Sequence, residues 1–439
     1  MKNWILAGAA SAALTVSPVP AFAAANPELP APGSSIGGAA DQAVSAFYAS
    51  RHGAPLWLNN ASAAGALINA LQHASLDGLP NGPKIALQAE ALMARASTGD
   101  EQARADAERL LSTAWVLYVQ ALQRPPSGMT YADKMVTPRT SSPAQILAKA
   151  SAASSLAAHV RTVANVNPVY ADLRDAAWSH MQANGGSVDP RVLASLERVR
   201  DMSPQERFVI VDAAGAKLYM IDGDRIVDSM RVIVGKSDPS MQTPMLASTI
   251  YYATLNPYWH VSQEMIRSTI ARNVLSLGTG YLRERGYQVM PVDPSDDTLL
   301  DPAEVDWHAV AAGAEKVRVR QLPGPANSMG QLKIGFPNAT DIFLHDTPVK
   351  TAFSSGDRSL SHGCIRLEDA QRLGRWLLGA DPRPTSDEPE QHAKLPTPVP
   401  IYVTYLTAHA TDGQVAFVDD IYGRDTQPVR VSQASFSTN

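Results

Sequence analysis

The chain has 439 residues, of which 45% are hydrophobic and 18% are charged, and its formal net charge is -5 at pH 7. These values are ordinary for a globular protein of two or three domains. They include no basic stripe of the kind that nucleic acid requires, so we set nucleic-acid binding aside.

Residues 1–23 have the pattern of a secretory signal peptide. A positive charge at Lys2 precedes an apolar run from Trp4 to Val16, and small residues at Ala21 and Ala23 favour cleavage after Ala23. A membrane anchor is the weaker alternative, because the run is shorter than the roughly 20 apolar residues of a spanning helix. No second long apolar stretch follows. We therefore expect an exported, periplasmic protein that is not integral to the membrane.

Residues 24–40, rich in Ala, Pro, Gly and Ser, are predicted to form a flexible leader. Residues 41–200 are rich in Ala and Leu with helical spacing. In the segment 101–122, for example, apolar residues recur at steps of three and four, which gives a helix one apolar face. Breaks at "DGLPNGP" and "RPPSG" divide the region into several short helices. We predict a helical domain here, without catalytic spacing.

The sequence changes character at Arg207, where short runs rich in Val, Ile and Tyr begin: "RFVIV", "AKLYMI" and "IVDSMRVIVG". The Asp222-Gly223 pair between the last two runs is a hairpin signal. Further strands are predicted at "STIYYATL", "LKIGF", "DIFLH" and "VPIYVTYLT", and a helix at "LEDAQRLGRWLLG". Residues 262–325 are a partly helical insertion, and insertions of this length often cover a site.

These elements predict an α+β protein, in which the helical domain is followed by a β-rich catalytic domain at 206–425 with a capping insertion. Residues 426–439 are expected to form a C-terminal tail.

Cys364 is the only cysteine in the chain. In an oxidising, exported setting it has no internal partner for a disulfide. A thiol becomes a good nucleophile when an imidazole accepts its proton and when a helix N-terminus stabilises the thiolate. The helix predicted from Leu367 would supply the second effect. The candidate bases are His345, His362 and the more distant His260.

We expect His345 to be the base, because it ends an apolar strand and is therefore rigidly mounted. His362 is two residues from Cys364, a spacing that rarely aligns a sulfur with a ring nitrogen. Reactivity should then rise through a pKa near that of a histidine. Gly363 lets the backbone turn so that neighbouring amides face an oxyanion. Arg366 either binds a substrate carboxylate or holds the loop.

Two alternatives stay open from the residues alone. His345, His362, Cys364 and Asp346 are residue types that suit zinc, although the paired spacings of structural zinc sites are absent. Cys364 could also be a buried structural cysteine with incidental histidines nearby.

The segments "LHDTP" (344–348) and "SHGCIRLED" (361–369) resemble the signature of the YkuD-type L,D-transpeptidases, cysteine enzymes that remodel peptidoglycan. Upstream, "VGKSDPSMQTP" matches a family pattern at Gly235, Thr243 and Pro244. "LNPYWHVS" and "DDIYGRD" are similar to the long, scaffold-bearing branch of the family. "AFYASRHGAPLWLNN" and "DGLP" are similar to the scaffold domain of that branch.

The resemblance implies that Cys364 is the nucleophile and His345 the general base and acid. The backbone around Gly363 and Cys364 would form the oxyanion hole. Three further residues would support the site: Ser361, His362 and Arg366. Substrate would contact four others: Tyr258, Trp259, His260 and Asp346. The resemblance also implies peptidoglycan stem peptides as partners and neither a metal nor an organic cofactor. It leaves the oligomeric state open.

Two departures from the branch affect substrate choice. The chain passes from residue 200 to Arg207 without room for a peptidoglycan-binding module, and His260 and Ser262 stand where the branch usually has asparagine and proline. We expect transfer of an L-residue carbonyl to the side-chain amine of diaminopimelate. The departures slightly favour 1,3 cross-links, from L-alanine to diaminopimelate, over 3,3 cross-links. Water or a protein lysine as acceptor, and a non-catalytic wall-binding scaffold, are the alternatives.

Overall fold

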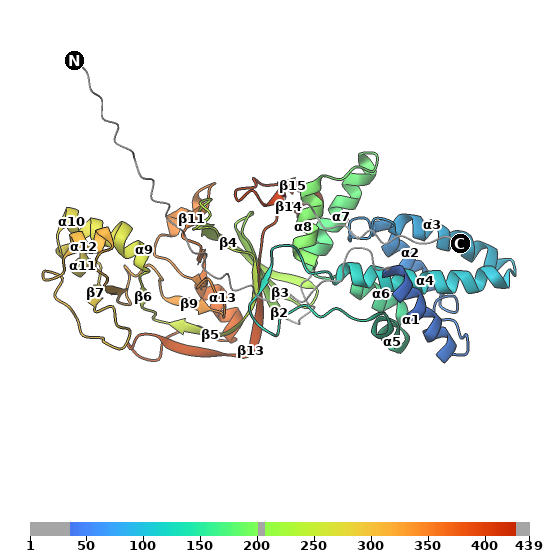
Figure 1. Cartoon of the computed structure of the whole chain (residues 1–439), viewed down its shortest axis with the longest axis horizontal. Coiled ribbons are helices and arrows are strands. Elements are labelled where there is room, and N and C mark those ends of the chain that lie inside the picture. The colour runs from blue at the N-terminus through green and yellow to red at the C-terminus, as the bar shows by residue number, and fades with distance from the viewer. Residues whose placement is uncertain (1–35, 201–206, 427–439) are drawn as a thin grey trace, which may run out of the picture.

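Figure 1 shows a computed structural model of the chain, which describes residues 36–200 and 207–426. The predicted signal peptide lies outside these residues, as do most of the predicted leader and tail. No helix within the two described ranges is both long and apolar enough to cross a membrane. The predicted α+β class is confirmed, because helices dominate the first range and strands the second.

The N-terminal half consists of helices α1 (Ile36–Ser50), α2 (Ala61–His73), α3 (Gly82–Ser97), α4 (Glu101–Leu122), α5 (Pro143–Ala152), α6 (Leu156–Ala164), α7 (Pro168–Ala183) and α8 (Pro190–Arg200). Several begin at a polar side chain that accepts a hydrogen bond from the first turn, as Asp100 does for α4 and Asn167 for α7. Helix α4 lies in the core, where Trp115 and Tyr118 are fully buried.

Two predictions about this half are corrected. Residues 36–40 were expected in the leader but belong to α1, because Ala40 is fully buried against the helical core. The region is also not wholly helical. Strand β1 (Thr130–Tyr131) pairs in parallel with strand β5 (Leu246–Leu255) of the following domain. The backbone amide of Thr130 donates to the Met245 carbonyl at 3.2 Å.

One sheet dominates the second half. Its strands are β1, β5, β2 (Arg207–Asp212), β3 (Lys217–Asp222), β4 (Arg225–Gly235), β9 (Leu332–Gly335), β10 (Leu344–His345), β11 (Ser359–Ser361), β12 (Ile365–Leu367) and β13 (Gln391–Thr404). The order is β1-β5-β13-β2-β3-β4-β12-β10-β9, and β11 pairs with β4. Because β9 also pairs with β5, the sheet closes on itself. Strands β2, β3 and β4 form the predicted meander.

The two faces of the sheet have different neighbours, as the alternation along β2 shows. Phe208 and Ile210 join the core of the helical half, whereas Val209 and Val211 join a second core together with helix α13 (Ala370–Leu378). The catalytic half therefore packs directly on the helices, and Figure 1 shows the sheet between the helices α1–α6 and the capping segment.

The capping segment between β5 and β9 has its own core, which includes Ile266, Trp307 and Val319. It contains β6 (Trp259–His260), α9 (Gln263–Met265), the π-helical turn η1 (Ile266–Ala271), α10 (Arg272–Leu277), α11 (Gly280–Glu284), β7 (Tyr287–Met290), α12 (Trp307–Ala312) and β8 (Arg318–Gln321). The remaining short elements are η2 (Lys350–Ser354), β14 (Ala408–Thr411), β15 (Gln414–Phe417) and η3 (Arg424–Thr426).

The helix expected to begin at Leu367 begins later. Ile365 and Leu367 are fully buried and pair with strands β10 and β4, so residues 365–367 form strand β12. Helix α13 starts at Ala370, where the Asp369 side chain caps it by accepting from the Arg372 amide at 2.9 Å. A strand thus separates Cys364 from the helix N-terminus, and the expected dipole effect on the thiol is not supported.

Candidate active site

Strands β10 and β12 place His345 next to the segment that contains Cys364. They run in parallel, with Leu344 paired to Ile365 and His345 paired to Arg366. Residues paired across neighbouring strands point to the same face. Leu344 and Ile365 point into the core, so His345 and Arg366 lie on the opposite face. Cys364 lies directly before strand β12, two residues from Arg366, and packs in part against the sheet core.

The hydrogen bonding of His345 sets its tautomer. The imidazole is 3% exposed, and its Nδ1 lies 2.6 Å from the Asp346 carbonyl oxygen. A carbonyl oxygen can only accept, so Nδ1 carries the hydrogen and Nε2 keeps a free lone pair. The ring of Phe343 packs edge-on at 5.6 Å between centroids. His345 is therefore rigidly held with Nε2 able to accept a proton.

Both reactive groups are neutral at neutral pH. Burial lowers the pKa of His345 to about 3, and repulsion by Arg366 and Lys333 acts in the same direction. Burial raises the pKa of the Cys364 thiol to about 11, although the amide of Phe343 and the charges of Lys333 and Arg366 favour the thiolate.

The Cys364 thiol forms its hydrogen bond with a group other than His345. Cys364 Sγ lies 3.7 Å from the Asp341 carbonyl oxygen, and no hydrogen bond in the described part of the chain joins it to His345. Catalytic hydrogen bonds often tighten only when substrate is bound.

The turn before Cys364 is fixed by one hydroxyl group. Ser361 Oγ donates to the Cys364 carbonyl at 2.6 Å and accepts from the Gly363 amide at 3.1 Å. Gly363 has φ of +110°, which glycine adopts without strain. The Gly363 amide therefore already has a hydrogen-bond acceptor in Ser361 Oγ. The Cys364 amide has no hydrogen-bond partner among the described residues and is the better oxyanion donor.

Arg366 is a half-buried cation without a fixed partner. Within residues 36–200 and 207–426 its guanidinium makes no hydrogen bond or ion pair. Burial lowers its pKa. The loop-holding role left open by the sequence is therefore not supported by any contact, and the guanidinium is free to receive an anion.

Lys333 is a site residue that sequence reasoning missed. It lies directly opposite His345 on strand β9, and its Nζ is 4.4 Å from the centroid of the Phe343 ring. The strand "LKIGF" was predicted, but its register against β10 has no signal in the sequence. Lys333 and Arg366 therefore flank His345 with two positive charges.

The remaining predicted site residues are His362, His260, Tyr258, Trp259 and Asp346. His362 is exposed, and partial desolvation and the positive charges of Lys236 and Arg366 lower its pKa although Glu264 of α9 opposes them. His260 Nε2 lies 3.4 Å from a carboxylate oxygen of Glu390 on the rim of the sheet.

Tyr258 and Trp259 are largely occupied within the capping segment. The guanidinium of Arg320 lies 4.6 Å from the Tyr258 ring centroid, and Trp259 packs against the core of the segment and against Tyr287. Neither residue hydrogen-bonds to Cys364 or His345 within the described ranges.

Asp346 is held in place by structural contacts. Its carboxylate accepts from Lys350 Nζ at 2.6 Å and from the Gln331 amide at 3.0 Å. We therefore assign it a structural role instead of the expected contact with substrate. As for the zinc alternative, no group of three or more His, Cys, Asp or Glu side chains in the described residues is arranged to hold a metal ion.

The lowered pKa of His345 and the raised pKa of Cys364 predict a pH dependence of thiol reactivity that differs from the one expected from the sequence. Alkylation of Cys364 by iodoacetamide in the native protein should stay slow through pH 7 and rise only above about pH 9, because the thiol pKa is raised to about 11. The urea-unfolded chain is the matched control, since its single cysteine should titrate near about 8.5. A native profile that reaches its plateau by neutral pH would contradict the neutral pair.

Comparisons with known proteins cover most of the chain. Residues 206–401 match the family model of the L,D-transpeptidase catalytic domain, YkuD, and residues 42–176 match that of the Scaffold domain. A curated Haemophilus influenzae protein named "Putative L,D-transpeptidase" is 26% identical over 395 residues, which are 87% of this chain and 78% of that protein.

Two solved structures are also similar. "L,D-transpeptidase from Mycobacterium smegmatis" is 14% identical with a TM-score of 0.23, over 45% of this chain and 58% of that one. "Structure of the Ldtfm-avibactam carbamoyl enzyme" is 11% identical with a TM-score of 0.23, over 46% of this chain and 51% of that one. The chain thus matches between half and three fifths of the length of these two proteins.

The site described above lies wholly within the catalytic-domain match, since His345, Cys364 and Arg366 fall between residues 206 and 401. The helices α2–α6 and parts of α1 and α7 fall within the Scaffold match. The resemblance found in the sequence is confirmed: this chain carries a Scaffold domain followed by a YkuD-type L,D-transpeptidase catalytic domain.

Proposed function

We propose that the protein is an exported peptidoglycan L,D-transpeptidase in which Cys364 is the nucleophile and His345 the general base and acid. One observation carries the proposal. Strand pairing sets His345 beside Arg366, two residues after Cys364, and the imidazole keeps the Nε2 lone pair free. A base held in this way can serve a nearby nucleophile without a third charged group.

The first half-reaction acylates the thiol. Nε2 of His345 takes the proton from Cys364 as Sγ attacks the carbonyl carbon of an L-residue in the donor stem. The Cys364 amide donates to the oxyanion that develops. The imidazolium then gives its proton to the amine of the departing D-residue, and a thioester remains.

The second half-reaction restores the enzyme. Nε2 of His345 takes a proton from the side-chain amine of diaminopimelate in an acceptor stem, and the amine attacks the thioester carbonyl. The sulfur leaves and recovers the proton from the imidazolium. Because the Asp346 carbonyl accepts from Nδ1, the imidazolium is stabilised in both steps.

Attack at the bond between L-alanine and D-glutamate, which gives 1,3 cross-links, is our proposal for the donor. It is supported by the short passage between α8 and β2, too short for a wall-binding module, and by His260 and Ser262 in the altered segment. Attack at the third residue would give 3,3 cross-links instead.

An amine acceptor is preferred over water or a protein lysine, because the capping segment between β5 and β9 would narrow the access of water to the thioester. Water would make the protein an L,D-carboxypeptidase. A lysine acceptor would attach a lipoprotein to the wall.

The test of the proposed function uses purified sacculi. After incubation with the protein and digestion, mass spectrometry of the cross-linked muropeptides should show dimers joined from L-alanine to diaminopimelate. Dimers joined only between two diaminopimelates would reject the 1,3 assignment while keeping the reaction class. Unchanged muropeptides together with binding that persists in Cys364→Ala would instead indicate a wall-binding scaffold. As an independent check, a carbapenem should add its mass to the wild type and not to Cys364→Ala.

Arg366 is predicted to bind a carboxylate of the donor stem. Replacing it by Gln removes a charge without a structural partner, so the apparent KM for the donor should rise about tenfold to a hundredfold, as loss of a charge-assisted hydrogen bond of about 1.5–3 kcal/mol implies. Arg358→Gln is the control, because that guanidinium bonds to the carbonyls of Ser355 and Gly215. An unchanged KM with a reduced kcat would contradict a binding role.

A further inference from the structure

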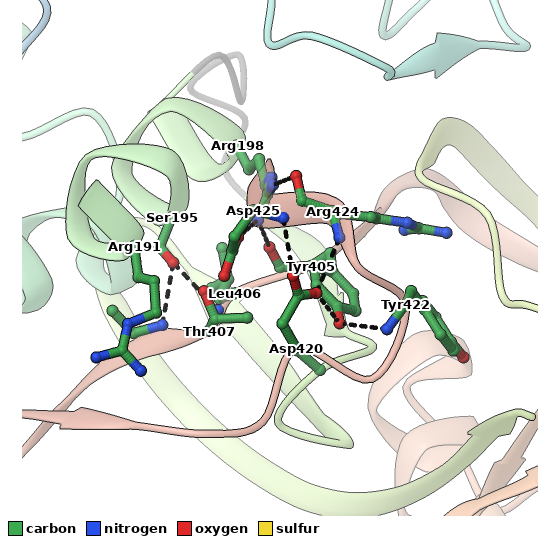
Figure 2. Close-up of polar contacts among 12 residues, drawn as sticks. Arg191, Ser195, Arg198, Tyr405, Leu406, Thr407, Asp420, Tyr422, Arg424 and Asp425 are labelled. Atoms are coloured by element: carbon green, nitrogen blue, oxygen red, sulfur yellow. Dashed lines mark hydrogen bonds and ion pairs between the residues drawn. The ribbon is translucent and has the colours of Figure 1, made fainter. Parts of the chain in front are cut away.

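Helix α8 and the chain after strand β13 lie outside the two matched regions, and Figure 2 shows that they form one polar cluster. Ser195 Oγ on α8 accepts from the backbone amides of Thr407 at 3.1 Å and Ala408 at 3.0 Å. The Thr404 hydroxyl donates to the Arg198 carbonyl at 3.1 Å. The helix is therefore fixed to the end of β13.

Arg198 lies at the centre of this cluster. Its side chain is 9% exposed and pairs with Asp425 at 2.7 Å. The same guanidinium donates to the carbonyls of Tyr405 at 3.1 Å and Arg424 at 2.7 Å. A planar guanidinium with several partners fixes their relative positions more strictly than a single ion pair does. Helix α8 thus determines where residues 424 and 425 lie.

Arg424 and Tyr422 extend the cluster toward the catalytic turn. Arg424 Nη2 donates to the Thr243 carbonyl at 2.9 Å, and its guanidinium lies 4.8 Å from the Tyr422 ring centroid. The Tyr422 hydroxyl donates to the Gly235 carbonyl at 2.6 Å. Two side chains of the C-terminal segment therefore hold the loop between Gly235 and Thr243.

That loop holds the residue before the nucleophile. The Thr243 hydroxyl donates to the Gly363 carbonyl at 2.7 Å and accepts from the Gly235 amide at 2.9 Å. The loop is closely packed, since a Cβ on Gly235 would lie 1.9 Å from the Met241 carbonyl oxygen. A shift of the loop would thus move the peptide between Gly363 and Cys364, which carries the amide assigned to the oxyanion.

We propose that Arg198 and Tyr422 are positioning residues, which hold the Gly363–Cys364 peptide in place through Arg424 and Thr243. The predicted effect on the acylation rate rests on the proposed function of Cys364. The predicted effect on the structure of the turn before Cys364 does not. Helix α8, which lies between the two matched regions, thereby helps to hold the peptide that carries the Cys364 amide.

The test uses Tyr422→Phe, which removes the hydroxyl and keeps the ring that stacks on Tyr405 at 5.2 Å. Arg198→Lys tests the helix side of the cluster. The matched control is Tyr251→Phe, because the Tyr251 hydroxyl donates to Asp133 at 2.7 Å and also joins the two halves, but without a contact to Gly363. Hydrogen exchange is measured on the peptide 360–367, and carbapenem acylation is measured as separate binding and rate constants.

We expect faster exchange in the peptide 360–367 for Tyr422→Phe and Arg198→Lys, and wild-type exchange for Tyr251→Phe. The acylation rate constant should fall about tenfold in the first two variants with an unchanged binding constant, as loss of one oriented hydrogen bond implies. The double variant should lose about as much as either single variant, because both act on one unit.

Exchange that is unchanged, or raised equally in all three variants, would overturn the positioning role. A wild type that is not acylated would overturn the proposed function instead, and the exchange data alone would then decide whether the cluster positions the turn.

Discussion

Replacing His345 by Gln should lower the rate of Cys364 acylation by about 10²–10⁴-fold, the usual contribution of general acid–base catalysis. The loss is expected because the thiol, with a pKa raised to about 11, supplies almost no thiolate of its own at neutral pH. Without Nε2 of His345 the thiol proton loses the acceptor that the proposed mechanism assigns to it. The measurement is the acylation rate constant for a carbapenem by intact-protein mass spectrometry.

Two other histidines serve as controls for this experiment. His362→Gln removes the alternative base two residues from the cysteine. His392→Gln removes an exposed imidazole on β13 that bonds to the Thr254 hydroxyl at 3.1 Å. His392→Gln should acylate within about threefold of wild type, a difference of less than 1 kcal/mol in the barrier, and His362→Gln should lose clearly less activity than His345→Gln. If His362→Gln alone abolished acylation, the choice of base would be wrong.

The variant also tests the effect of burial on stability. Because the folded pKa of His345 is lowered to about 3, the unfolded chain binds the proton more readily between about pH 6.5 and pH 3. This residue therefore destabilises the native protein as pH falls through that window. His345→Gln should remove this part of the acid sensitivity, which urea titrations at about pH 7 and pH 4.5 can measure.

The sequence predicted those parts of the fold that local chemistry specifies. The hairpin between β3 and β4 follows from Asp222-Gly223, where Gly223 has φ of +62°. The pairing of Cys364 with a strand-end histidine was inferred from the roles that a thiol and an imidazole play, and it stays a prediction. The helix α13 was predicted as an element, although its first residue was placed too early.

The predictions that failed concern features that depend on contacts between segments distant in the sequence. Residues 130 and 131 become a strand only because β5 offers its edge, and Lys333 becomes a site residue only through the register of β9 against β10. The pKa values of His345 and Cys364 could not be predicted from the sequence for the same reason. Reactivity was expected to rise through a pKa near that of a histidine, but burial, which is a property of the assembled sheet, lowers the pKa of His345 and raises that of Cys364.

Replacing Gly363 by Ala should lower acylation by about 10²–10³-fold while the protein stays folded, because this is the usual effect of losing one oxyanion-hole donor. Gly363 has φ of +110°, and an added Cβ would lie 3.0 Å from Ile342 Cδ1 and 3.6 Å from the Gln242 carbonyl oxygen. Alanine at this φ is strained by about 1–3 kcal/mol, and the easiest relief is rotation of the peptide that carries the Cys364 amide.

The matched control for Gly363→Ala is Gly99→Ala, where φ is +94° and no atom lies within 4 Å of the added Cβ. This change imposes similar backbone strain in the helical half, so it should lower the melting temperature to a similar extent and leave acylation unchanged. The two effects can be separated because acylation is measured well below the melting temperature of each variant. A Gly363→Ala protein that acylates like Gly99→Ala would mean that the Cys364 amide does not stabilise the oxyanion, and that another donor in the site does so.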